Sequence, residues 1–164
     1  MKIITPYNID LDILSADETL WSSFAKKFVI LPKDVKDILL LDNTTAFLLD
    51  ISHQLTLNEE QTKELTRIIR DVLLGDIFIN DMSATISQKL NADQQTAQQI
   101  RDKIVKELFA SAIEDIKKIQ QDKFPDRVGQ GSVSTMPQPP APPQMKNVPP
   151  VNQSNVIDLR NQPQ

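Results

Sequence analysis

Residues that interrupt helices are distributed very unevenly along this chain. Before residue 122 they are limited to Pro6, Pro32 and Gly75. In contrast, eight of the eleven prolines lie between residues 137 and 163. Proline removes a backbone donor and glycine increases backbone freedom, so the interiors of helices contain few of either. The first region can therefore fold into helices, whereas the second is unsuited to them.

Apolar residues in the first region recur three or four positions apart, which is the spacing of a buried helix face. We predict an all-α fold in three parts: an extended N-terminal arm (1–14), a helical bundle domain (15–121) and a disordered Pro/Gln-rich C-terminal tail (122–164). The compact bundle should contain about six helices, which begin near Ser15, Pro32, Asp42, Asn58, Asn80 and Asn91. The helix after Asn58 should end at Gly75 in a left-handed cap and bury one apolar stripe: Leu65, Ile68, Ile69, Val72 and Leu73. The last of the six helices is long for such a bundle, so it either kinks near residues 110–112 or projects at its end.

The amino-terminal region carries two local patterns. Residues 9–13 alternate between apolar and acidic side chains, which is typical of a half-buried strand. We interpret them as an extended arm on the bundle, or as a strand added to the sheet edge of another chain. Ser15 and Glu18 have the spacing of a capping box, and the helix that follows should bury an apolar set of four, Leu20, Trp21, Phe24 and Phe28.

Residues 51–75 and 86–110 are weakly similar at an offset of 35 positions. Ile51, Ser52 and Leu55 in the first segment correspond to Ile86, Ser87 and Leu90 in the second. The similarity predicts two related helical hairpins, although two units are marginal evidence for a helical repeat. Chance agreement between amphipathic helices remains the alternative.

Composition argues against several classes of function. The formal net charge is −4, and the tail is slightly basic, so the helical part is the more acidic. DNA and anionic membranes reward clustered Lys and Arg, so neither is the expected partner. The chain contains no cysteine and lacks the apolar stretch of a signal peptide or a membrane span. We expect a cytoplasmic protein that does not insert into membranes.

No motif predicts catalysis, a metal or a cofactor. His53 is the only histidine, with Asp50 one helical turn before it, but no nucleophile or oxyanion glycine accompanies this pair. Gly75, Gly129 and Gly131 do not form a phosphate-binding loop. We interpret His53 as a partly exposed helix residue and expect no enzyme activity.

Lys63, Arg67 and Arg70 would lie along one side of a helix, where they form a basic stripe. Such a stripe can contact nucleic-acid phosphates, although acidic residues surround it at helix-pair spacing. A small regulatory protein that contacts nucleic acid through the stripe is therefore our alternative function. Residues 76–79, which follow Gly75, should fill the core between hairpins or form an exposed docking patch.

The tail ends in an apolar and charged cluster that a passive spacer does not require. We predict that it is a short partner-binding peptide, formed by Val156, Ile157, Asp158, Leu159 and Arg160 within residues 155–160. The leading hypothesis is a non-enzymatic adaptor or scaffold module. Its bundle binds one protein, of unknown identity, and its tethered peptide recognises another.

Overall fold

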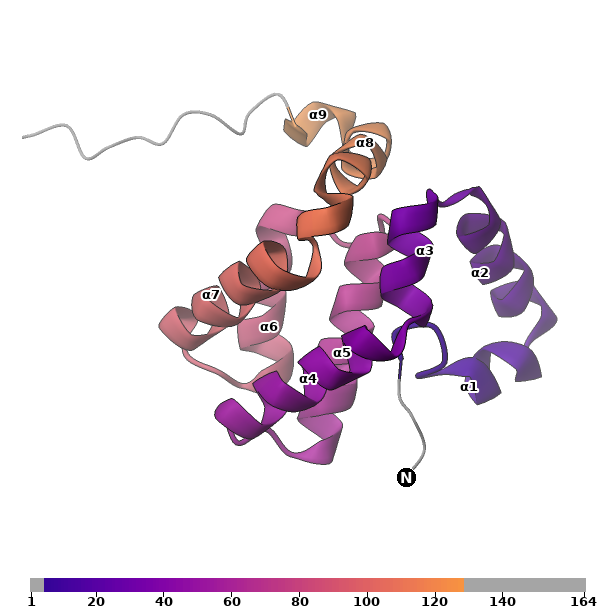
Figure 1. The fold of residues 1–164 in the computed structure, drawn as a ribbon. Helices are drawn as coiled ribbons and strands as arrows, with labels where there is room; N and C mark the ends of the chain where they lie inside the picture. Colours follow the sequence, from indigo (N-terminus) through magenta and orange to yellow (C-terminus); the bar gives the residue numbers. More distant parts are fainter. Residues whose placement is uncertain (1–4, 129–164) are drawn as a thin grey trace, which may run out of the picture. The chain divides into compact units, whose positions relative to one another are not determined.

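The helix α5, Glu59–Leu73, provides the largest part of the core in the computed structural model, which describes residues 5–128. Asn58 caps α5 through a reciprocal pair of hydrogen bonds with Gln61, as a capping box requires. The predicted apolar stripe is buried throughout, with Leu65, Ile68, Ile69, Val72 and Leu73 each at most 2% exposed. Figure 1 shows α5 among the other helices, between α3 and α6.

All regular elements of the described residues are helical, which confirms the all-α fold. Nine are α-helices: α1 (Leu11–Ala16), α2 (Glu18–Ile30), α3 (Lys33–Leu40), α4 (Asp42–Gln54), α5, α6 (Met82–Leu90), α7 (Gln94–Lys103), α8 (Ile113–Lys123) and α9 (Pro125–Val128). Residues 5–128 also contain three shorter elements: the 3₁₀ turn η1 (Ile79–Asp81), the π turn η2 (Ile104–Leu108) and the 3₁₀ turn η3 (Ala110–Ala112). The number exceeds the predicted six because α1 and α9 add a short helix at each end of the described residues and because the long last helix is divided.

The extended conformation predicted for the amino-terminal arm is wrong for residues 9–14. Thr5 and Asn8 exchange hydrogen bonds, with Thr5 N donating to Asn8 Oδ1 at 2.7 Å, and the chain turns directly into α1. The backbone N–H of Tyr7 donates to Leu39 O at 3.1 Å, which attaches this turn to α3. The short alternation resembled a strand, but no neighbouring strand is present here to satisfy an extended backbone.

The predicted start and buried face of α2 also need correction. Asp17, rather than Ser15, caps α2 by accepting the amides of Thr19 and Leu20 at 2.8 and 3.1 Å. Phe24 is buried and Phe28 packs against the core, but Leu20 and Trp21 are 47% and 38% exposed. The helix has apolar residues on two faces, and periodicity alone cannot tell which face meets the core.

Gly75 ends α5 with a left-handed backbone, at a φ of 74°. A Cβ atom at this position would lie 2.7 Å from Lys123 Cγ and 3.0 Å from Ile119 Cγ2 of α8. Glycine therefore serves two purposes, because it forms the helix terminus and lets α8 approach.

The predicted last helix is interrupted at the expected place. Phe109 N donates to Ile104 O at 2.9 Å, which closes a π turn, and Ala112 N then donates to Phe109 O in a tighter turn. The wider turn rotates the following residues, so Phe109 becomes fully buried while Leu108 is only partly buried. The first of the two predicted alternatives, a kink near residues 110–112, is therefore confirmed.

The two segments of the proposed repeat contain equivalent turns. Thr56 and Asn91, which are 35 positions apart, both have left-handed backbones, at φ values of 54° and 53°. Leu57 N and Ala92 N donate to Ser52 O and Ser87 O, respectively, and Asn58 and Asp93 cap the helices that follow. This agreement concerns the turns alone, and a relationship between the whole hairpins stays a prediction.

Helical structure continues beyond the predicted start of the tail. Residues 122–128 complete α8 and form α9, where Phe124 packs on Phe78 with ring centroids 5.3 Å apart. The disordered tail was therefore predicted to begin too early. Residues 129–164, which include the predicted recognition peptide, lie outside the described residues.

Candidate functional site

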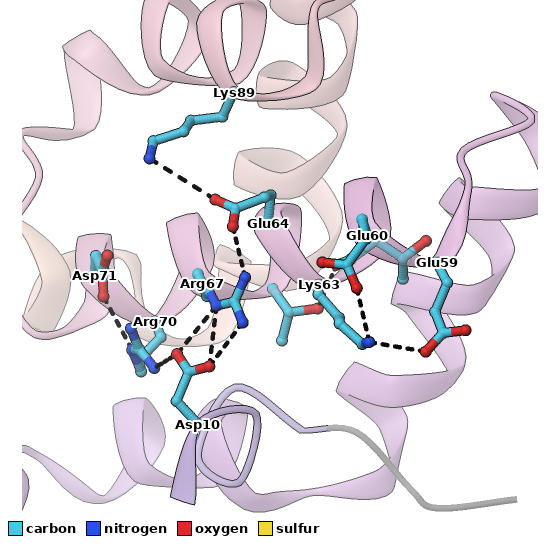
Figure 2. Close-up of polar contacts among 11 residues, drawn as sticks. Asp10, Glu59, Glu60, Lys63, Glu64, Arg67, Arg70, Asp71 and Lys89 are labelled. Carbon is cyan, nitrogen blue, oxygen red and sulfur yellow. Dashed lines mark hydrogen bonds and ion pairs between the residues drawn. The ribbon is translucent and has the colours of Figure 1, made fainter. Parts of the chain in front are cut away.

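The predicted basic stripe lies on α5, where two of its members bind Asp10. Arg67 Nη2 lies 2.9 Å from Asp10 Oδ1, and Arg70 Nη1 lies 2.7 Å from Asp10 Oδ2. Figure 2 shows the Asp10 carboxylate between the two guanidinium groups. This carboxylate is only 12% exposed, and it belongs to the residue that directly precedes α1. The contacts therefore attach the start of α1 to α5.

The cluster changes the acidity of its carboxyl groups in opposite directions. Burial raises the pKa of Asp10, but hydrogen bonds from Arg67 and Arg70 outweigh it, so the pKa is lowered overall. Burial raises the pKa of Asp71, and the nearby Arg70 guanidinium opposes this increase only in part. Burial of Arg70 favours its neutral form, yet Asp71 and Asp10 together hold its pKa above the ordinary value. Asp10 is therefore the carboxylate that the two arginines stabilise in its charged form.

The rest of the stripe is also paired with acidic side chains. Lys63 Nζ lies 2.8 Å from Glu59 and 3.0 Å from Glu60, and Arg67 additionally binds Glu64. Glu64 in turn approaches Lys89 of α6 at 4.0 Å, the longest contact drawn in Figure 2. These pairs balance the positive charge along the stripe, which leaves little of it to attract a polyanion.

His53 is exposed in the last turn of α4. Asp50, the residue expected to orient a catalytic imidazole, instead accepts hydrogen bonds from Gln54 at 2.7 Å and Lys103 at 3.1 Å. The two residues therefore do not form the pair that general-base chemistry requires.

The segment after Gly75 fills part of the core, as the first of its two interpretations predicted. Phe78 is 7% exposed, and Ile77 and Ile79 pack against buried residues. Gln120 of α8, itself 2% exposed, holds the segment in place. Its amide nitrogen donates to Val72 O and Ile77 O, both at 3.1 Å, and its oxygen accepts from Ile79 N at 2.9 Å.

A cavity of about 350 Å³ opens next to this segment. Its walls come from η1, the α7–η2 junction, α8 and α9, and its apolar lining includes Phe78, Val105 and Ile113. The volume lies within the range of about 300–1,000 Å³ that is typical of ligand sites. The sequence provides no pattern for this cavity, since its walls are assembled from separate elements.

Three cationic side chains line the cavity: Arg101, Lys117 and Arg127. Each binds a carboxylate, with distances of 2.8 Å to Asp102, 2.7 Å to Glu114 and 2.6 Å to Asp81. None of these three carboxylates belongs to the lining, so the cations are the charged groups that border the opening. Arg127 also lies over the Phe78 ring, 4.5 Å from its centroid, which holds this cation at the apolar wall.

Residues 5–128 contain no group of three or more His, Cys, Asp or Glu side chains that could hold a metal ion. No helix in this part of the chain combines the length and apolar character needed to cross a membrane. Comparisons of the chain with protein-family models, with curated proteins and with solved structures found no match.

Proposed function

We propose that this protein is a non-enzymatic interaction module whose helical unit binds an apolar, acidic segment of a partner protein in the cavity between η1 and α8. The observation that carries the proposal is the combination of apolar walls with three cations, Arg101, Lys117 and Arg127. Apolar side chains of the segment would enter the cavity, and its carboxylates would face the cations. The walls favour binding through burial, while the charges select the partner.

The recognition peptide, residues 156–160, is the second element of the proposed function. It would recognise another protein while the helical unit holds the first. A flexible connection to the helical unit would raise the concentration of the peptide near any bound partner, which increases avidity without a new contact. The module would thereby act as an adaptor.

The nucleic-acid alternative has weaker support. Arg67 and Arg70 are occupied by Asp10, and Lys63 is occupied by Glu59 and Glu60. The carboxylates paired with the cavity cations are 46–74% exposed, whereas Asp10 is 12% exposed, so a phosphate backbone would have to displace a nearly buried partner of Arg67 and Arg70. We therefore retain the stripe as an anchor for α1.

Two neighbouring lysines of α8 provide a matched test of the cavity. Lys117 and Lys118 each pair with a carboxylate three positions earlier, and their side chains are 64% and 72% exposed. Only Lys117 lines this cavity. We therefore expect Lys117→Glu to reduce the captured amount of a partner that binds in the cavity about tenfold, and Lys118→Glu to leave that amount unchanged. The measurement is capture from native cell lysate by the full-length protein, quantified by mass spectrometry.

The same experiment tests the peptide through the triple variant Val156→Ala, Ile157→Ala and Leu159→Ala. We expect it to lose a different set of proteins and to retain the cavity partner. A binding segment of the cavity partner should contain Asp or Glu next to aliphatic residues. If the wild type, Lys117→Glu and the triple peptide variant captured identical sets of proteins, the adaptor function would be contradicted.

A further inference from the structure

The exposed apolar side chains of residues 5–128 are concentrated on α2. Half of the large exposed hydrophobic residues of this region belong to that one helix: Leu20, Trp21, Val29 and Ile30. Val29 and Ile30 are 70% and 77% exposed, whereas the opposite face of the helix holds the buried Phe24. Figure 1 shows α2 at the margin of the described helices, next to α1. The outer face of α2 is therefore available for an intermolecular contact.

The side chains of this outer face have the spacing of a helix surface that packs against another helix. A shallow hollow of about 610 Å³ is lined by residues of α2 alone. The lining contains two successive sets at i, i+3, i+4 and i+7: Glu18, Trp21, Ser22 and Ala25, then Ser22, Ala25, Lys26 and Val29. Four residues at this spacing form the hole that receives one side chain of a facing helix. Ser22 and Ala25 belong to both holes, and their small side chains permit close approach.

The charges of the face indicate which helix it accepts. Glu18 and Lys26 are exposed, and neither side chain has an ion pair within the described part of the chain. Ser22 lies midway between them, at about 6 Å along the axis from each. A two-fold axis at Ser22 would place Glu18 of each copy against Lys26 of the other. A parallel arrangement would instead bring identical charges together.

We propose that the outer face of α2 pairs with a second copy of this chain in an antiparallel, two-fold symmetric arrangement centred near Ser22. One helix supplies the holes, the apolar side chains beside them and both members of the ion pair. Such self-complementarity is the requirement of an isologous interface. This surface is separate from the cavity on α8, so the inference does not depend on the proposed function. A dimer would carry two recognition peptides, which strengthens binding to a partner with repeated sites.

Sedimentation velocity of the full-length protein over a range of concentrations tests the interface. We expect the wild type to form dimers and Ser22→Glu to prevent them, because the two new carboxylates would meet across the axis. Ala84→Glu, at an exposed position of α6, makes the same charge change away from this face and should leave the dimer intact. Circular dichroism verifies that each variant remains helical.

Charge exchange identifies the partner and the orientation. Glu18→Lys and Lys26→Glu should each weaken self-association about tenfold, since both ion pairs become like-charge contacts. The double variant should restore it, and a mixture of the two single variants should form heterodimers with both ion pairs present. A wild type that is monomeric at every concentration, or dimers indifferent to Ser22→Glu and to charge exchange, would overturn the proposal.

Discussion

At the scale of single residues, Asp10 has a structural role that the neighbouring sequence does not indicate. It occurs in a stretch that resembles a strand, yet its carboxylate binds two arginines that follow it by 57 and 60 positions. Together with Arg67 and Arg70 it forms a partly buried cluster, in which removal of the anion leaves two cations without a partner. The cluster therefore joins the amino-terminal segment to α5 through electrostatics.

The pKa of Asp10 predicts how this contribution depends on pH. A carboxyl whose folded pKa is lowered stabilises the fold fully above its unfolded value of 3.8, and the stabilisation is lost as the pH falls through the folded pKa. We expect Asp10→Asn to reduce the free energy of unfolding by about 2 kcal/mol at neutral pH. The difference from wild type should diminish below pH 3.8.

Urea denaturation followed by circular dichroism measures this difference at each pH. Asp126→Asn, which changes an exposed aspartate outside the cluster, should alter stability by less than about 0.5 kcal/mol. The Asp10 charge is also a minor cause of the raised pKa of Asp71, so its removal in Asp10→Asn offsets a small part of the stability lost at neutral pH. A pH-independent difference would contradict the role assigned to Asp10.

At the scale of elements, the turns before α5 and α7 have the same backbone geometry but different residues at the left-handed position. Asn91 suits that conformation because its short polar side chain tolerates it, whereas the β-branched Thr56 does not. Both helices nevertheless begin at a side-chain cap, Asn58 or Asp93. The turn before α5 therefore carries backbone strain that its equivalent avoids.

This difference makes Thr56→Asn a stabilising change. We expect it to raise the free energy of unfolding by about 1 kcal/mol, because the left-handed conformation costs asparagine less. The reciprocal change, Asn91→Thr, should lower it by a similar amount. Thermal and urea denaturation of the two variants measure both effects, and equal stability of all three proteins would contradict the backbone strain assigned to Thr56.

Several elements were predictable because their signals are local. Asn58, the apolar stripe of α5 and Gly75 together predicted one helix with its start, buried face and end. The interruption near residues 110–112 was one of two predicted alternatives. In contrast, α2 was assigned the wrong cap and too large a buried set, because Asp17 competes with Ser15 and because both faces of the helix are apolar.

At the scale of the whole molecule, the described residues differ in how firmly they are held. The core residues of α5, α6 and the α7–η2 segment are almost completely buried, including Leu65, Ile69, Ile86 and Ile104. The helices α1 and α2 contribute one buried apolar residue, Phe24, and are held by a few specific contacts. These include the Asp10 cluster and an ion pair from Lys27 to Asp76 at 2.5 Å. Stability should therefore decrease from α5 towards α2.

Native-state hydrogen exchange measures this gradient, in a solution dilute enough to dissociate the proposed dimer. We expect the amides of α2 to exchange through a local opening of lower free energy than the amides of α5. Asp10→Asn should reduce protection in α1 and α2 more than in α5. If α2 exchanged only through the global unfolding that exposes α5, the region would form one cooperative unit with the core.

Local sequence patterns were sufficient to predict the all-α fold of the described residues, the position of α5 and the left-handed terminus at Gly75. Each of these predictions depends on the spacing or the backbone chemistry of residues within a single short segment. Three other features could be identified only from the packed helices: the Asp10 cluster, the exposed face of α2 and the cationic border of the cavity. Their members lie far apart in the chain or depend on which helix face is covered. Such information arises only when the helices pack.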